Sequence, residues 1–158
     1  MAKLILGTAQ FGLNYGIHNQ NGKPSSDEIK EILDFAFKSK INILDTAEAY
    51  GNSQERIGDY IKKSRNKFQI ITKYSHLRTD LPSNIIDRVK KNLETLNINN
   101  CYCYMFHNFK DYRAFFDLFQ EDLLHLKREG LIDKIGVSLH SNIEIFAVLN
   151  NDNIDLIQ

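Results

Sequence analysis

Four short apolar runs in this sequence each lead directly into a polar side chain. The runs cover residues 41–44, 68–72, 101–106 and 134–137, and they end on Asp45, Lys73, His107 and Ser138. Tyr50 follows Asp45 by five positions. Because the carboxyl ends of parallel strands lie on one rim of a sheet, we expect all of these side chains to converge there.

Asp, Tyr, Lys and His together form an acid for a carbonyl oxygen. A tyrosine hydroxyl has a pKa near 10, and an ammonium group such as that of Lys73 would favour its phenolate and ease proton release. Asp45 would hold Lys73 charged, and His107 would fix the carbonyl oxygen within reach of Tyr50. None of these groups supplies a hydride, so the chemistry requires a nicotinamide cofactor.

The stretch of residues 43–51 also has a purely structural interpretation. Asp45 would then cap the loop that follows it, and Tyr50 would pack against that loop. The polar ends of the neighbouring runs, at Lys73 and His107, favour the catalytic interpretation, because chance rarely places three ionisable groups on consecutive strand ends.

Predicted strands and helices alternate along the whole chain. We expect strands at residues 3–6, 41–44, 68–72, 101–106, 134–137 and 154–157. We expect helices that begin at a Ser25–Glu28 capping box, at Asn52 or Ser53, at Pro82–Ser83, after His107 (ending at Gly130) and at Asn142. This order predicts βαβ crossovers around a parallel sheet, in one domain that covers residues 1–158.

The composition is that of an ordinary globular protein. Of the 158 residues, 42% are hydrophobic, and twenty basic residues balance twenty acidic ones. This balance gives no general attraction to nucleic acid or to an anionic membrane, and no apolar stretch approaches the length of a membrane span or a signal peptide. We expect no nucleic-acid partner, no membrane and a cytoplasmic location.

Cys101 and Cys103 are the two cysteines of the sequence. On a strand they would share one face, too close in sequence for a useful disulfide. A metal site would need more ligands than this pair, so we expect two buried thiols in a reducing compartment and no bound metal.

The motifs taken together resemble those of the aldo-keto reductases. The matching segments are Leu6-Gly7-Thr8, Leu44-Asp45-Thr46-Ala47 through Tyr50-Gly51, Ile71-Thr72-Lys73, Phe106-His107-Asn108, Leu126-Lys127-Arg128-Glu129-Gly130 and Ile135-Gly136-Val137-Ser138. The resemblance implies a (β/α)8 TIM-barrel fold, present here as an incomplete barrel of about six strands and five helices. It also implies the reduction of an aldehyde or ketone, as a small carbonyl substrate, with NADPH or, in some members, NADH.

The resemblance also assigns roles to single residues. It places the catalytic tetrad on Asp45, Tyr50, Lys73 and His107, with Tyr50 as the proton donor. The implied contacts to the cofactor fall on Gly7, Thr8, Asp45, Ser138 and Gln158.

Two departures from the family pattern affect the cofactor site. Leu139 stands where family members commonly have an asparagine after the serine, and His140 or Asn142 would have to replace that amide. Barrel phosphate sites follow the seventh and eighth strands, and this chain is expected to supply six.

Three functions therefore stay open at this stage. The first is a reductase in which a longer parent protein is active. The second is an inactive truncated fragment or pseudoenzyme that self-associates as a homo-oligomer through its exposed sheet edges. The third is a regulatory subunit that senses nicotinamide nucleotide.

Overall fold

Parallel strands form one curled sheet at the centre of the protein. The computed structural model describes residues 4–17 and 19–158, and in this part of the chain there are six strands: β1 (Leu6–Gly7), β2 (Ile43–Asp45), β3 (Gln69–Tyr74), β4 (Cys103–Phe106), β5 (Ile135–Val137) and β6 (Leu156–Ile157). They pair in chain order, every pair parallel. The predicted parallel sheet and barrel-type fold are confirmed; Lys3, in the first predicted strand, lies outside the described residues.

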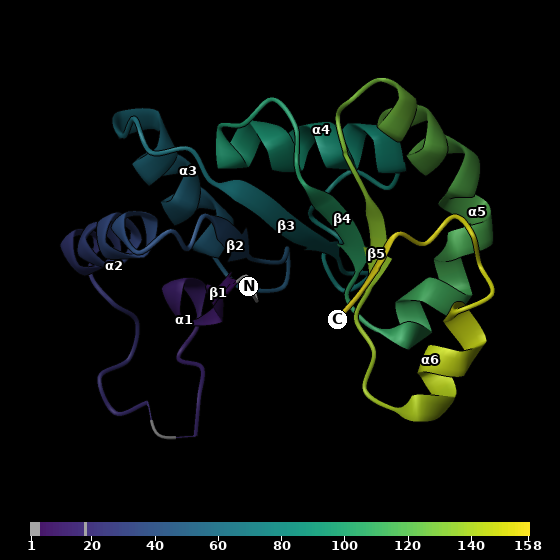
Figure 1. Ribbon diagram of the computed structural model, residues 1–158, viewed down its shortest axis with the longest axis horizontal. Coiled ribbons are helices and arrows are strands. Elements are labelled where there is room, and N and C mark those ends of the chain that lie inside the picture. The colour runs from purple at the N-terminus through teal and green to yellow at the C-terminus, as the bar shows by residue number, and fades with distance from the viewer. Residues whose placement is uncertain (1–3, 18) are drawn as a thin grey trace.

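The helices cover the convex side of the sheet. They are α1 (Ala9–Gly12), α2 (Ser26–Lys38), α3 (Ser53–Lys63), α4 (Ile85–Leu96), α5 (Phe109–Arg128) and α6 (Asn142–Val148). Figure 1 shows α2 to α5 as an arc outside the strands, so that the concave side forms the interior of a partial barrel. The predicted capping box is confirmed, because Ser25 Oγ accepts from the Glu28 N–H at 3.2 Å and Glu28 Oε2 accepts from the Ser25 N–H at 2.7 Å. The single turn of α1 was not predicted.

Side chains alternate between the two faces of the sheet, as the pleat of a strand requires. The inner face holds a small apolar cluster of Ile43, Ile71, Cys103 and Met105, with Leu156 packed against it. Leu44, Ile70, Tyr104 and Phe106 lie between these positions and belong to the two larger clusters under the helices. Asp45, Lys73 and His107 each come two residues after a member of the inner cluster, so the alternation directs them to the barrel interior.

The helices approach the sheet and one another closely. A Cβ added to Gly58 of α3 would lie 2.1 Å from the Thr95 carbonyl oxygen of α4, so only glycine allows this packing. The helical spacing of apolar residues predicts that Ile86, Val89, Leu93 and Leu96 form the buried face of α4. The last three are buried as predicted, while Ile85, at 1% exposed, takes the place expected for Ile86.

The two cysteines are buried free thiols, as predicted, but they do not share a face. Cys103 belongs to the inner cluster, and Cys101 to the large cluster under α4 and α5. The reason is that β4 begins only at Cys103, after a bend at Tyr102, while Cys101 forms an isolated bridge with Ile132.

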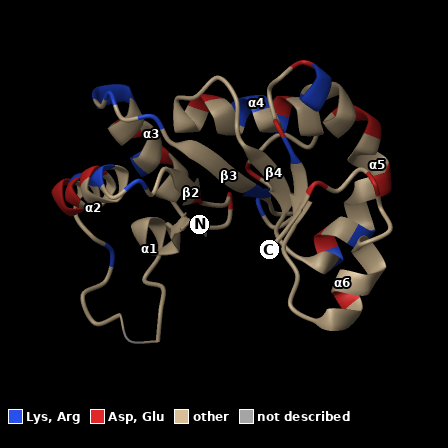
Figure 2. Cartoon of the chain, in the orientation of Figure 1, with Lys and Arg blue, Asp and Glu red and all other residues tan. Residues whose placement is uncertain are grey.

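The outer surface carries charges of both signs. Figure 2 shows acidic and basic residues interspersed over α2 to α5. Among the described residues no helix is both long enough and apolar enough to cross a membrane.

Candidate active site

An ion pair between Asp45 and Lys73 lies at the rim formed by the carboxyl ends of the strands. Lys73 Nζ donates to Asp45 Oδ1 in a short hydrogen bond and to the Thr46 carbonyl oxygen at 3.2 Å. Lys73 is 2% exposed and Asp45 is 7% exposed. Because the burial of either charge alone would be strongly unfavourable, the two residues can be buried only as a pair.

Tyr50 lies close to both Lys73 and His107. Lys73 Nζ is 5.3 Å from the centre of the Tyr50 ring, which places the ammonium near the aromatic face. The rings of Tyr50 and His107 meet edge to face, with centres 5.5 Å apart. The structure thus brings together four of the five side chains that the sequence predicted to converge, Asp45, Tyr50, Lys73 and His107.

The electrostatics of Tyr50 differ from the sequence-based expectation. Burial, reinforced by the negative charge of Asp45 and by Tyr15, raises the pKa of Tyr50 to about 12. We expected Lys73 to favour the phenolate, but burial and the charge of Asp45 dominate the pKa of Tyr50 and raise it, while burial also lowers the pKa of Lys73. In this arrangement Tyr50 keeps its proton throughout the neutral range.

His107 is a neutral ring in this environment. Burial, and then the positive charge of Lys73, lower its pKa from the ordinary value of 6.5. Its Nδ1 atom is buried and has no hydrogen-bond partner among the described residues. A neutral imidazole carries one N–H donor, which suits it to hold a carbonyl oxygen.

The loop that carries Tyr50 is held against α1. A Cβ on Gly12 would lie 1.8 Å from the Tyr50 carbonyl oxygen, and one on Gly51 would lie 2.4 Å from the Gly12 carbonyl oxygen. Gly51 also has a φ of 55°, in the left-handed region that favours glycine. Only a pair of glycines allows the two backbones to come this close.

The residues predicted to contact a cofactor occupy two different environments. Gly7 lies opposite Asp45 in the β1–β2 register, and a Cβ there would meet no atom within 4 Å. Thr8 is fully buried, and its hydroxyl donates to the Asp45 carbonyl oxygen at 2.9 Å. The Thr8 side chain therefore serves to join the first two strands.

Ser138 and Gln158 follow the ends of β5 and β6. Each lies two residues beyond an inward-facing position, Gly136 and Leu156 respectively. The Leu139 N–H donates to the Gln158 carbonyl oxygen at 2.8 Å, while the Leu139 side chain packs against the cluster under α5. His140 and Asn142, the proposed replacements for the family's asparagine, are both exposed.

A cavity of about 340 Å³ opens beside Asp45 and Tyr50. Its walls also include Gly7, Thr8, Ala9, Gln10, Tyr15 and Gly16. Gln10 and Tyr15 were not predicted as site residues, although their position shortly after the Leu6-Gly7-Thr8 motif was a usable signal. The open space at Gly7 and the size of the cavity fit a flat ring such as nicotinamide.

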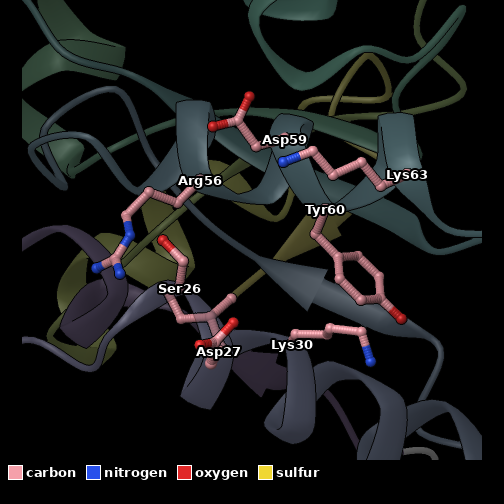
Figure 3. Close-up of a pocket in the computed structure, with 8 residues that line it drawn as sticks. Ser26, Asp27, Lys30, Arg56, Asp59, Tyr60 and Lys63 are labelled. Atoms are coloured by element: carbon pink, nitrogen blue, oxygen red, sulfur yellow. The ribbon is translucent and has the colours of Figure 1, made fainter.

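A second hollow, of about 210 Å³, lies on the outer surface between α2 and α3. Figure 3 shows that charged side chains of both signs line it. Arg56 is already bound to the Phe11 and Pro24 carbonyl oxygens, and Lys30 pairs with Asp34. It includes no residue of the rim, and its lining mixes basic side chains (Lys30, Arg56, Lys63) with acidic ones (Asp27, Asp59), which selects neither an anion nor a cation.

The chain belongs to the aldo-keto reductases: the family model described as "Aldo/keto reductase family" matches residues 3–157. This match confirms the resemblance inferred from the motifs. A search of curated proteins found no match.

Solved structures of other proteins have a similar fold. PA4992 from Pseudomonas aeruginosa, assigned to the aldo-keto reductases, is 27% identical and superposes with a TM-score of 0.75 over 95% of this chain and 60% of its own. The glycerol dehydrogenase AKR11B4 from Gluconobacter oxydans is 24% identical, with a TM-score of 0.71 over 98% of this chain and 50% of its own.

An aldo-keto reductase from Klebsiella pneumoniae, solved in complex with NADPH, is 18% identical, with a TM-score of 0.70 over 98% of this chain and 52% of its own. At these identities the last two show the fold alone. The chain spans between 50% and 60% of the length of the three structures.

Proposed function

We propose that an eight-stranded barrel containing this chain reduces an aldehyde or ketone to an alcohol with a nicotinamide nucleotide, NADPH, and that Tyr50 is the proton donor. The observation that carries the proposal is the proximity of the Tyr50 ring to both the Lys73 ammonium and the His107 ring. The likeness to a structure solved with NADPH supports the choice of cofactor.

Each residue of the rim has a distinct part in this proposal. The nicotinamide cofactor, when bound, would supply the hydride for the carbonyl carbon. Tyr50 gives its hydroxyl proton to the carbonyl oxygen, and its raised pKa of about 12 ensures that the proton is present at neutral pH. His107, kept neutral by burial, donates a hydrogen bond to the same oxygen and so orients it.

Asp45 and Lys73 support the proton donor electrostatically. Asp45 holds the buried Lys73 ammonium in place beside the phenol ring. As the substrate oxygen takes up the proton, negative charge develops on Tyr50, and a fixed cation nearby stabilises that charge more than it stabilises the neutral phenol. Lys73 is therefore more important in the transition state than in the resting protein.

The cavity beside Tyr50 is proposed as the place where nicotinamide and substrate meet. Gly7 and Asp45 would face the nicotinamide, with Ser138 and Gln158 on the inner rim beyond β5 and β6. Gln10 and Tyr15 line the outer part of the cavity and are placed to contact a small carbonyl substrate.

The replacement Tyr50→Phe tests the proposal, because it keeps the ring and removes only the hydroxyl. In the eight-stranded barrel we expect carbonyl reduction to fall by about 10²–10⁴-fold, with NADPH affinity nearly unchanged. Tyr112→Phe is the matched control: it removes a hydroxyl in the outer cluster, which accepts from Asn151 at 2.9 Å, and should leave the rate intact. A Tyr50→Phe protein that reduces aldehydes at the wild-type rate would refute the assignment.

A further inference from the structure

A second buried ion pair lies on the outer side of the sheet, beneath α4. Glu48 is fully buried and Arg88 is 4% exposed. Glu48 Oε2 accepts from Arg88 Nη2 at 2.6 Å and from the Ser75 N–H at 3.0 Å. Glu48 Oε1 accepts from Asn92 Nδ2 at 2.6 Å and from the Tyr104 hydroxyl at 2.8 Å. Every acceptor atom of this buried carboxylate is thus satisfied.

The network joins the two segments that carry catalytic side chains. Glu48 lies two residues before Tyr50, and its N–H donates to the Lys73 carbonyl oxygen at 3.1 Å. Ser75 lies two residues after Lys73, and its carbonyl oxygen accepts from Arg88 Nη2 at 2.6 Å. The backbone next to Tyr50 and the backbone next to Lys73 are therefore both held by the same ion pair, the Glu48 carboxylate and the Arg88 guanidinium.

The Tyr50 loop has a second attachment on its other side. There the backbones of Gly12 and Gly51 are in close contact. Only Ala49 and Tyr50 lie between this contact and Glu48. The hydroxyl of Tyr50 has no hydrogen bond within the described part of the chain, so the direction of its ring depends on these two attachments and on the contacts to Lys73 and His107.

A buried ion pair is a poor device for stability alone, because well-packed apolar side chains usually do as well. A carboxylate with several fixed donors instead fixes the position of the backbone that carries it. The donors to Glu48 come from β4, from α4 and from the residue after β3, and together they hold the Tyr50 loop in one place. In catalysis, an error of about 1 Å in a reacting group lowers the rate by about 10²-fold.

We propose that Glu48 is a positioning residue for the proton donor, which sets the place of Tyr50 relative to Lys73 through its bonds to Arg88, Asn92, Tyr104 and Ser75. This inference rests on the proposed role of Tyr50. It adds a function for charged residues that touch neither the substrate nor the cofactor.

The first test is Glu48→Gln in the eight-stranded barrel. The variant keeps the length of the side chain but replaces one acceptor oxygen by an NH2 group, which cannot accept from the surrounding donors. We expect kcat to fall by at least about tenfold, while KM for NADPH changes less than about threefold. Glu94→Gln makes the same chemical change at an exposed site on α4 and should alter neither constant.

A general loss of stability must be separated from a loss of position. Leu33→Ala, a cavity in the outer core at a fully buried residue, destabilises the fold without a link to Tyr50. Measured well below its melting temperature, it should retain the wild-type kcat. If Leu33→Ala lowers kcat as much as Glu48→Gln does at equal stability, the positioning role is overturned.

A second measurement does not depend on turnover. In protein labelled with ¹³C at the tyrosine Cζ atom, the Tyr50 resonance should move in Glu48→Gln and stay in place in Glu94→Gln. Should Glu48→Gln not fold, Tyr104→Phe removes a single donor to Glu48 Oε1 and should give a smaller change of the same kind. An unmoved Tyr50 resonance overturns this inference, whereas an active Tyr50→Phe protein overturns the proposed function.

Discussion

The rings of Tyr50 and His107 meet edge to face, with their centres 5.5 Å apart and their planes at 88°. This contact holds the phenol ring through its edge and face and leaves the Tyr50 hydroxyl free of hydrogen bonds to the described residues. Two neutral donors thus stand side by side at the rim. A single carbonyl oxygen is the kind of acceptor that such a pair can hold.

The first prediction concerns the titration of His107. Its pKa in the folded protein is lowered below 6.5, so between these two values the unfolded chain binds more protons than the folded one. The contribution of His107 to the free energy of unfolding is therefore complete above pH 6.5 and is lost as the pH falls through the folded pKa. An NMR titration of the histidine ring protons should give a midpoint below 6.5 for His107.

His107→Gln provides the control for that titration. Denaturant unfolding of the two proteins from pH 8 to pH 5 should show a smaller acid-dependent loss of stability in the variant. A His107 midpoint at or above 6.5 would contradict the buried, neutral ring.

The second prediction separates catalysis from stability at Lys73. Lys73→Met leaves Asp45 buried without its partner, which should lower the free energy of unfolding by about 3–5 kcal/mol. In the double variant Asp45→Leu with Lys73→Met, both charges are gone, so most of the stability should return while carbonyl reduction stays low. Return of both stability and activity in the double variant would show that the pair is structural only.

The third prediction tests Gly7 as a surface for the cofactor. Gly7→Ala and Gly7→Val add atoms to open space, so the free energy of unfolding should change by no more than the effect of about 1 kcal/mol that strand propensity allows. The melting temperature should change correspondingly little. In the eight-stranded barrel the affinity for NADPH should fall in that order, by at least about tenfold for valine, equivalent to 1.4 kcal/mol. Equal affinity in all three proteins would remove Gly7 from the cofactor site.

The fourth prediction concerns the 158-residue chain produced by itself. Its edge strands are β1 and β6, and apolar side chains lie exposed beside them: Leu4 is 68%, Ile5 46% and Ile157 42% exposed. Unpaired edges of this kind pair with other chains. We therefore expect self-association in light scattering after gel filtration, and weak or absent quenching in a NADPH fluorescence titration.

Ile157→Lys tests whether the β6 edge is the contact. A charge at an edge opposes strand pairing, so this variant should shift the chain toward the monomer. A wild-type chain that stays monomeric and binds NADPH at micromolar concentration would contradict the prediction.

The rim could be predicted from the sequence because its signal is local. Each apolar run that ends in a polar residue reports one strand end, and the parallel arrangement brings the ends of Asp45, Lys73 and His107 together without further information. The one-turn α1 gave no such signal, since four residues, Ala9–Gly12, are too few to show helical periodicity. Its importance lies in a contact with Gly51 far along the chain.

The Glu48 network could not be predicted for a different reason. Arg88 and Asn92 have the polar character of the exposed face of an amphipathic helix, and the predicted apolar stripe of Ile86, Val89, Leu93 and Leu96 does not include them. The usable signal was their spacing from Ile85 and Leu96, which sets all four residues on one buried face. Buried polar residues require hydrogen-bond partners, and here those partners come from β4 and from the Tyr50 loop. Because both lie outside α4 in the sequence, no local pattern reveals these contacts.

Side chains alternate between the two faces of the sheet, so mutations on the concave face and mutations on the convex face should have different effects on this protein. Changes on the concave side that keep the buried Asp45–Lys73 pair, such as those at Gly7 or His107, alter chemistry in a chain that still folds around its outer clusters. Changes on the convex side alter the yield of folded protein. A library scored separately for soluble expression and for turnover would divide into these two groups, and Glu48 would be the convex-side residue whose conservative variants are found among the soluble but slow proteins.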